Sequence, residues 1–349
     1  MKIALVTEVT STIGGVETRV RNMLKYLSKE HDVKLYTSEN IINHPTIVNP
    51  PKRNLAYCLG FVFKLFFRLL KDDYDIIDAQ GHLVILPAFF AARIKNKKIV
   101  ITIHDLYLSD FEKMYKNKIS MLGKFYELIL TKLPCEKITV NSALAKRLNA
   151  SNIPNGIDYN YIRNIKQTKI SSRTNKKQVI FVGRLVPQKN VESLILAAYS
   201  IKDCRLLIVG EGNEEYKLKQ MKNELKAMNI IFKKHLNYNN IIKLIKQSDI
   251  LVMPSKRESM GIVILEALAS GTAVISTKTD GPKDYIKNNK NGFLVDDDVL
   301  KIKEKLYLLL NDDNLRKKIE KNGIATASKY DWKYAICKIS SLYKNMMKG

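Results

Sequence analysis

The sequence predicts an α/β protein with two doubly wound domains. Short apolar runs that read as buried parallel strands alternate with helical stretches along the whole chain. At 349 residues, the chain is also too long for one ordinary hydrophobic core. We expect the first domain at residues 1–163, a polar and basic linker at 164–177, the second domain at 178–329, and a terminal helix at 330–349.

The chain is rich in cations, with a formal net charge of +25 at pH 7. The charge is spread over both halves and indicates attraction to phosphates, whether of nucleotides, nucleic acid or anionic lipid. The four cysteines show neither metal-ligand spacing nor a disulfide framework, so we expect a cytoplasmic location. Residues Met1–Thr10 read as a first strand and not as a signal peptide, and no apolar stretch reaches the roughly 20 residues that span a bilayer.

The most informative stretch is Asp249–Ile275, which reads as strand, polar loop, helix and strand. The carboxyl end of the first strand is where a parallel α/β domain places its ligand. Glu258 lies in this loop, and Glu266 is the only charged residue of the apolar helix that begins after Gly261. A buried carboxylate needs a partner, and near a helix N-terminus it is well placed for a ligand hydroxyl or a cation. Each glutamate taken alone is explained as simply by a solvated loop charge or a structural cap.

Two strand ends in the first half carry residues suited to a ligand. Gly14 and Gly15 separate the first strand from a helix, where glycines let the backbone approach a phosphate or sugar, although a tight turn explains them equally well. His104 follows a later strand and is placed for chemistry by the same rule. The alternative is a structural histidine satisfied by Asp105.

Arg184 and Lys189 leave the first strand of the second half together. Two cations at a strand end can clamp a diphosphate and hold the charge that builds on it as it departs. The alternative is a solvated basic loop, which is common in a chain so rich in lysine.

The stretch Leu55–Leu70 is apolar apart from Lys64 and Arg68, and it reads as a helix. The simpler interpretation is a buried crossover helix packed on a sheet. The alternative is an interfacial helix lying on a membrane, with Lys64, Arg68 and Lys71 as a narrow basic edge. The basic and aromatic segment 107–132 is expected either to hold an acceptor with a lipid phosphate or to form a solvated surface.

Three motifs resemble those of one enzyme family: E-S-M-G-I-V-I-L-E-A at 258–267, G-R-L-V-P-Q-K-N at 183–190 and N-G-I-D at 155–158. With them the sequence resembles the retaining, nucleotide-sugar-dependent glycosyltransferases of family 4, also called glycosyl transferases group 1. The resemblance implies a GT-B fold, in which two Rossmann-like domains face a central cleft and the last helix crosses back to the first domain. Met260 departs from the family, which usually has an aromatic residue there.

The resemblance also implies roles for individual residues. In the family, the counterparts of Glu258 and His104 contact the donor sugar, that of Glu266 holds the ribose hydroxyls, and those of Arg184 and Lys189 bind the donor phosphates. We therefore expect Glu258, His104, Arg184 and Lys189 to be catalytic. The expected donor-binding residues are Gly14, Gly15, Arg184, Lys189, Glu258, Ser259, Met260, Gly261, Ile262, Val263 and Glu266.

The expected function is retaining, metal-independent transfer of a hexose from a UDP- or GDP-sugar to a glycan or a lipid-linked acceptor, without a cofactor. An anionic membrane surface, at the inner face of the membrane, is a candidate partner, and no specific nucleic acid is expected. One alternative is a catalytically inactive relative of the same fold, which the intact glutamates and cations argue against. The other is a basic protein that binds nucleic acid or another anionic surface, but the chain has no recognised nucleic-acid-binding module.

Overall fold

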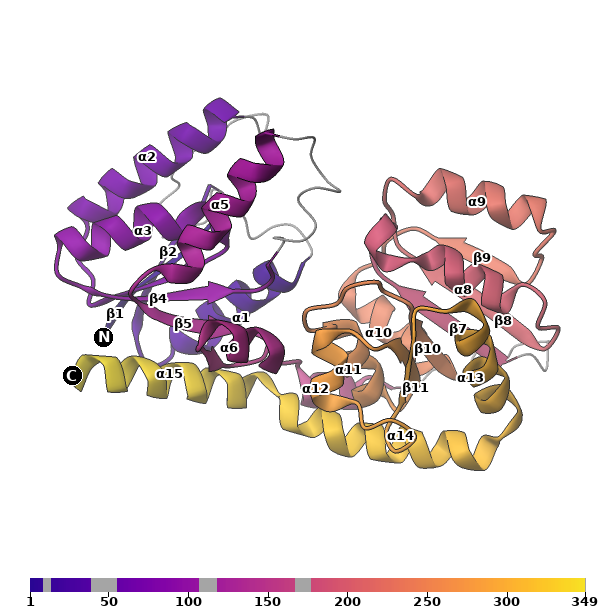
Figure 1. The fold of residues 1–349 in the computed structure, drawn as a ribbon. Helices are drawn as coiled ribbons and strands as arrows, with labels where there is room; N and C mark the ends of the chain where they lie inside the picture. Colours follow the sequence, from indigo (N-terminus) through magenta and orange to yellow (C-terminus); the bar gives the residue numbers. More distant parts are fainter. Residues whose placement is uncertain (9–13, 39–54, 107–117, 167–176, 349) are drawn as a thin grey trace. The chain divides into compact units, whose positions relative to one another are not determined.

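The computed structural model describes residues 1–8, 14–38, 55–106, 118–166 and 177–348. The expected linker 164–177 and the segment 107–132 therefore lie partly outside the described residues. The chain divides into two compact units, one of Met1–Asn155 with Lys333–Gly349 and one of Gly156–Trp332. Each unit contains a six-stranded parallel sheet with helices packed on it (Figure 1), so the predicted pair of doubly wound α/β domains is confirmed.

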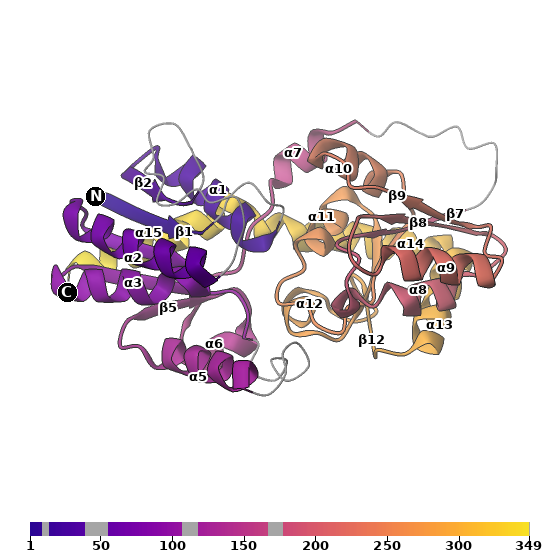
Figure 2. The same cartoon turned by 90° about the horizontal axis from the view of Figure 1, so that it is seen from above.

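In the first unit the strand order is β2-β1-β3-β4-β5-β6. Its elements are β1 (Lys2–Thr7), α1 (Gly15–Leu27), β2 (Asp32–Tyr36), α2 (Leu55–Lys71), β3 (Ile76–Gln80), α3 (His82–Ile94), β4 (Lys98–Ile103), α5 (Lys118–Lys132), β5 (Glu136–Thr139), α6 (Ser142–Leu148), β6 (Ser151–Asn152) and most of α15 (Trp332–Lys348). Helices α2, α3 and α5 lie on one face of the sheet and α15 lies on the other (Figure 1, Figure 2). The strand order reverses between β1 and β3, which is where doubly wound domains bind ligands.

In the second unit the strand order is β12-β11-β10-β7-β8-β9. Its elements are α7 (Tyr159–Asn164), β7 (Lys177–Val182), η1 (Pro187–Lys189), α8 (Val191–Ala198), β8 (Cys204–Val209), α9 (Glu215–Glu224), β9 (Ile230–Lys233), α10 (Tyr238–Lys246), β10 (Ile250–Met253), α11 (Ile262–Ser270), β11 (Ala273–Thr277), α12 (Asp280–Tyr285), β12 (Phe293–Val295), α13 (Val299–Asn311), α14 (Asp313–Ala327) and η2 (Ser328–Tyr330). The strand order reverses between β7 and β10. The first unit ends at Asn155, before residue 163, because α7 packs on α11 of the second unit.

The strand, loop, helix and strand expected at Asp249–Ile275 are β10, α11 and β11. Helix α11 begins after Gly261 and ends at Gly271, and both glycines have the left-handed backbone conformation that glycine adopts at little cost. Between them the helix is apolar apart from Glu266 and Ser270, and it is buried from Ile264 to Ala269. Its two ends are therefore fixed by local sequence, and its burial is fixed by its composition.

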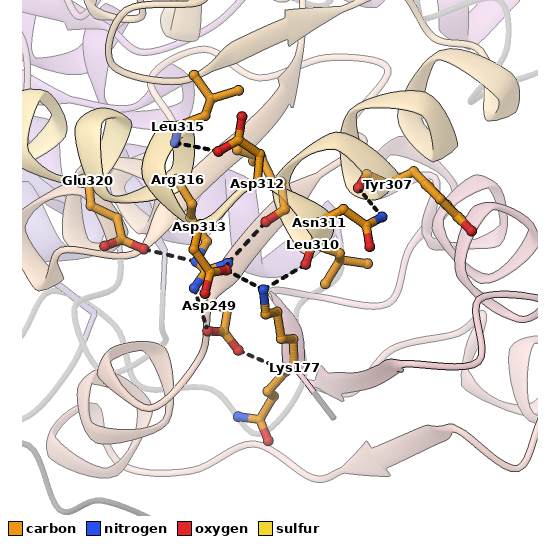
Figure 3. Close-up of polar contacts among 12 residues, drawn as sticks. Lys177, Asp249, Tyr307, Leu310, Asn311, Asp312, Asp313, Leu315, Arg316 and Glu320 are labelled. Atoms are coloured by element: carbon orange, nitrogen blue, oxygen red, sulfur yellow. Dashed lines mark hydrogen bonds and ion pairs between the residues drawn. The ribbon is translucent and has the colours of Figure 1, made fainter. Parts of the chain in front are cut away.

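A cluster of ion pairs ties the second sheet to α14 at the amino ends of β7 and β10 (Figure 3). The buried Arg316 guanidinium lies 2.6 Å from Asp313 and 3.7 Å from Asp249, and Asp249 accepts a hydrogen bond from the backbone N–H of Gln178 at 2.8 Å. Lys177 at the start of β7 pairs with the same Asp313. This cluster lies at the amino ends of the strands, whereas the candidate site residues of the second unit follow the carboxyl ends.

Across the described residues, no helix combines the length and hydropathy that a membrane-spanning segment needs.

Candidate active site

Glu258 and Lys189 form an ion pair at the point where the strand order of the second unit reverses. The Glu258 carboxylate lies 2.5 Å from Lys189 Nζ, and the two side chains are only 14% and 17% exposed. The Ser255 hydroxyl donates to the same carboxylate oxygen at 3.4 Å. Glu258 follows β10 and Lys189 follows β7, so the pair joins two neighbouring strand ends.

The loop that carries Glu258 is held in place by α12. The backbone N–H of Gly281 donates to the Glu258 carbonyl at 3.0 Å, and the buried Tyr285 hydroxyl donates to the Met260 carbonyl at 2.7 Å. A Cβ on Gly281 would lie 2.6 Å from the Met260 backbone, so only glycine allows this approach. The backbone from Glu258 through Ser259 to Met260 is thus fixed by its own packing.

The first turn of α11 supplies hydrogen-bond donors at the same place. Gly261 has a φ of 73°, and a Cβ there would lie 2.9 Å from the Tyr285 hydroxyl. The first N–H groups of a helix have no partner within the helix, and the helix dipole adds positive potential. Ile262 and Val263 are half-buried at this position. Loop and helix start together form a site of the kind that binds phosphate groups.

Arg184 lies on a loop with a fixed backbone and has an exposed side chain. The N–H of Leu185 donates to the Glu211 carbonyl at 2.9 Å, and a Cβ on Gly212 would lie 2.2 Å from the Leu185 carbonyl oxygen. The turn after β8 therefore holds the Arg184 backbone, while the guanidinium is accessible to a ligand.

Glu266 has a partner that the sequence did not reveal. It is 7% exposed, and its carboxylate accepts a hydrogen bond from the Tyr238 hydroxyl at the start of α10. Burial, together with the neighbouring Asp158, raises the pKa of Glu266 to about 8. The side chain is therefore mostly protonated at pH 7 in the unliganded protein, and it can both donate and accept a hydrogen bond.

In the first unit, the half-buried His104 lies at the end of a chain of buried polar side chains. His104 Nε2 lies 2.9 Å from Gln80 Oε1, and the Gln80 amide nitrogen donates to Asp78 at 2.5 Å and to Thr102 at 2.8 Å. The Tyr343 hydroxyl, from α15, donates to the second carboxylate oxygen of Asp78. The sequence suggested Asp105 as the structural partner of this histidine, whereas the hydrogen bond found is to Gln80.

This chain fixes which nitrogen of His104 carries the proton. Because the amide N–H groups of Gln80 face Asp78 and Thr102, the amide oxygen faces His104, and Nε2 must donate to it. Burial and the nearby Arg19 charge lower the pKa of His104 well below its usual range, so the ring is neutral at pH 7. Nδ1 is then a hydrogen-bond acceptor. His104 is suited to accept a hydrogen bond from a hydroxyl and is a poor proton donor.

Gly14 and Gly15 lie at the start of α1, after β1. Gly14 has a φ of −165°, which is extended backbone that any residue adopts. A Cβ on Gly15 would meet only Asn155, at 3.9 Å. A Cβ on Gly14 would lie 2.3 Å from Glu17 Oε2, which is the end of a flexible side chain. The backbone conformation of Gly14 and the packing around Gly15 therefore do not by themselves require glycine. Residues 9–13, which would form the turn, lie outside the described part of the chain, so the tight turn and the close approach to a ligand both stay predictions.

Each unit therefore gathers its candidate residues at the carboxyl edge of its own sheet. In the second unit these are the Lys189–Glu258 pair, the loop to Val263, and Glu266; in the first unit they are His104 and the two glycines. Sequence reasoning missed Gln80, although polar residues at alternate positions of an apolar strand are a signal of a buried network. Among the residues that the structure describes, no group of three His, Cys, Asp or Glu side chains is placed to hold a metal ion.

Two doubly wound domains with these strand-end residues define a GT-B glycosyltransferase. The family model for glycosyl transferases group 1 matches residues 163–326, and the model for glycosyltransferase family 4 matches residues 13–161. The two matches together cover nearly the whole chain, and the protein belongs to this family of glycosyltransferases.

Two known proteins of similar sequence are named as glycosyltransferases, and a solved structure has a similar fold. The chain is 26% identical to an uncharacterized glycosyltransferase of Methanocaldococcus jannaschii, with 96% of each chain covered. It is 27% identical to the UDP-Gal:alpha-D-GlcNAc-diphosphoundecaprenol alpha-1,3-galactosyltransferase of Escherichia coli, with 82% of this chain and 79% of the relative covered. Its fold matches Anabaena HepE, solved in complex with UDP and glucose, with a TM-score of 0.83 at 20% identity over 99% of this chain and all of the other.

Proposed function

We propose that this glycosyltransferase moves a hexose from a UDP- or GDP-sugar to a glycan or a lipid-linked acceptor, with retention at the anomeric carbon and without a metal ion. The observation that carries the proposal is the Lys189–Glu258 pair beside the N-terminus of α11, at the strand reversal of the second unit. A cation, a fixed loop and free helix N–H groups are what a diphosphate requires.

The relatives support this choice of substrates. The name of the E. coli relative specifies a UDP-sugar donor and an acceptor sugar carried on diphosphoundecaprenol. The Anabaena protein of the same fold binds UDP and glucose. All four cysteines of the present chain are free, which fits the reducing cytoplasm that we propose as its location.

In the proposed reaction, the second unit holds the donor. The N–H groups around Gly261 and the cations Arg184 and Lys189 bind the diphosphate, and Glu266 binds the ribose hydroxyls. As the bond between the sugar and the diphosphate breaks, negative charge grows on the leaving oxygen. Preorganised cations and N–H donors stabilise that charge more strongly than they stabilise the ground state, which lowers the barrier.

The first unit supplies the acceptor side and His104. The neutral imidazole accepts a hydrogen bond from a donor-sugar hydroxyl at Nδ1 and does not act as the acid. In a front-face displacement, the acceptor oxygen attacks the anomeric carbon from the side of the departing diphosphate. The leaving phosphate oxygen takes the acceptor proton, so the reaction needs no separate enzymatic base.

A thermal-shift panel of nucleotides and nucleotide sugars tests the donor class, because a ligand that binds the folded state raises its stability in proportion to affinity. UDP or GDP should raise the melting temperature of the protein, and Lys189→Ala should reduce the shift. The matched control Lys202→Ala changes an exposed lysine in the same unit. Turnover with the stabilising donor, followed by NMR of the product anomer in the presence of EDTA, then tests retention and metal independence. An inverted product, or activity abolished by EDTA and restored by Mg²⁺, would contradict the mechanism.

A further inference from the structure

Helix α2 has two apolar sides, and only one of them is covered. Its buried stripe is spaced four residues apart and consists of Tyr57, Phe61, Leu65 and Leu69. The opposite side of the helix carries a second apolar stripe, which consists of Leu59, Phe63 and Phe67. These three side chains are 59%, 64% and 57% exposed. Three consecutive exposed apolar positions on one helix stripe are unusual for a crossover helix, whose outer side normally carries polar residues.

Helix α5 shows the same pattern from an unrelated stretch of sequence. It buries Leu130 near its C-terminal end and exposes a stripe at helical spacing that consists of Met121, Leu122, Phe125, Leu128 and Ile129. Helix α3 lies between the two, in contact with both α2 and α5, and exposes Phe90 and Ile94. The three helices cover one face of the first sheet (Figure 1, Figure 2).

We call these ten side chains on α2, α3 and α5 the apolar face. In the second unit, by contrast, the exposed large side chains are mainly tyrosines spread over several helices, and a tyrosine hydroxyl can meet water. Exposed phenylalanine, leucine and isoleucine side chains gathered on three neighbouring helices mark a surface that something else covers.

The charges around the apolar face indicate which kind of partner covers it. The sequences of the three helices contain seven cations and one carboxylate, so 7 − 1 gives +6. That carboxylate, Glu127, is buried beside His82 and does not reach the surface. The next carboxylates along the chain, Asp72 and Asp73, are paired with lysines and with Arg68. The outer surface of the three helices thus combines apolar side chains with cations.

We propose that the apolar face docks on an anionic lipid bilayer. Side chains of this kind lie in the boundary between headgroups and acyl chains, while Lys64, Arg68, Lys71 and Lys132 contact lipid phosphates. A second copy of the chain is disfavoured, because each copy carries a net charge of +25 and the two faces would bring like charges together. This inference uses neither the donor site nor the identity of the acceptor, so it stands independently of the proposed reaction.

Vesicle flotation tests the apolar part of the face. The protein should float with vesicles of phosphatidylcholine and phosphatidylglycerol, and binding to pure phosphatidylcholine should be weaker. The triple variant Phe63→Ser, Phe67→Ser and Phe125→Ser should lose at least about tenfold in partition coefficient, since each change removes an inserted ring. The matched control Tyr216→Ser with Met228→Ser changes two side chains that are as exposed but lie in the second unit. A far-ultraviolet circular dichroism spectrum and a melting temperature close to those of the native protein show that each variant is folded.

Charge variants test the electrostatic part. Lys64→Gln with Lys71→Gln should weaken binding to the anionic vesicles by about 25-fold, from about fivefold for each cation near the surface. The control pair Lys338→Gln and Lys344→Gln removes the same charge from α15, on the other face of the sheet, and should change binding much less.

Insertion itself can be measured by fluorescence. The only tryptophan of the chain, Trp332, is buried, so lipids cannot reach it directly. In the variant Phe125→Trp, lipids brominated on the acyl chains should quench the added fluorescence, and they should not do so in Met228→Trp. Three results would overturn the proposal: no flotation with either vesicle, flotation that the triple variant retains, or a dimer in solution that the triple variant abolishes. The last would identify a second copy as the occupant.

Discussion

Replacing Glu266 with glutamine should stabilise the unliganded protein at alkaline pH and change its stability little at pH 5. Burial holds the pKa of Glu266 at about 8 in the folded chain, against an ordinary value of 4.5. Between these values the folded state binds a proton that the unfolded state has released, so the free energy of unfolding falls as pH rises. The contribution of protonated Glu266 to the free energy of unfolding is fully present below about pH 4.5 and is lost as pH rises through about 8. At about 1.4 kcal/mol for each pH unit, the loss totals about 5 kcal/mol.

Urea denaturation at pH 5, 7 and 9 measures this effect, with the fluorescence of the buried Trp332 in the same unit as the signal. The free energy of unfolding should fall with pH in the native protein and fall much less in Glu266→Gln, because the amide does not ionise. Glu224→Gln, at an exposed position of α9, controls for the loss of a charge. A stability difference between native protein and variant that is the same at pH 5 and pH 9 would show that Glu266 titrates normally.

The same residue links donor binding to protons. If the ribose hydroxyls donate to Glu266, ligand binding favours the carboxylate, and UDP or GDP should bind more tightly at pH 8 than at pH 6. Calorimetry in buffers of different ionisation enthalpy should detect the released proton at pH 7. Glu266→Gln should lose that release, together with about 1.5–3 kcal/mol of binding free energy for a charge-assisted hydrogen bond. Unchanged affinity with no proton release would remove Glu266 from the donor site.

Other changes test the remaining parts of the site. In steady-state kinetics, Arg184→Ala or Lys189→Ala should lower kcat by on the order of 10²-fold with a smaller change in donor KM. A raised KM at constant kcat would mean that the two cations bind the ground state and the transition state equally well. Gln80→Leu removes the hydrogen-bond acceptor that orients His104, so calorimetry should show weaker binding of the sugar-bearing donor and unchanged binding of the free nucleotide; equal losses for both ligands would indicate general disruption. Gly281→Ala places a Cβ 2.6 Å from the Met260 backbone, in the loop that carries Glu258. It should cost roughly 1–3 kcal/mol of stability in urea denaturation and weaken nucleotide binding, whereas a neutral result would mean that the loop adjusts.

The parts of the candidate site that lie within one short stretch could be predicted from sequence. The apolar run of β10, the loop with Glu258 and the glycines at the two ends of α11 are all local signals, each tied to a backbone requirement. The pairing of Glu258 with Lys189 could not be predicted, because it depends on β10 lying next to β7, which no local pattern specifies. The sequence placed both residues at strand ends, and only the strand order brought those ends together.

The partners that hold the site residues in place were beyond sequence reasoning for a related reason. Tyr238 bonds to Glu266, and Tyr285 bonds to the Met260 carbonyl. Each tyrosine lies on a different element from the residue that it holds. A tyrosine on an amphipathic helix gives no sign of whether its hydroxyl faces water or a buried group. The neutral state of Glu266 follows from that burial, so a residue could be placed in the site from sequence while its protonation state could not.

Helix α2 shows what hydrophobic periodicity can and cannot predict. A helix that is apolar nearly all round contains several stripes at the correct spacing, so its sequence cannot say which stripe is buried. Of the two interpretations open for Leu55–Leu70, the buried crossover helix describes one side of it, and the interfacial helix stays a proposal for the exposed side. The contact with α3 covers the stripe of Phe61 and leaves the stripe of Phe63 exposed. Because α5 exposes an apolar stripe of its own, the open side of α2 is part of a surface that several helices build together, and a single helix read alone could not reveal it.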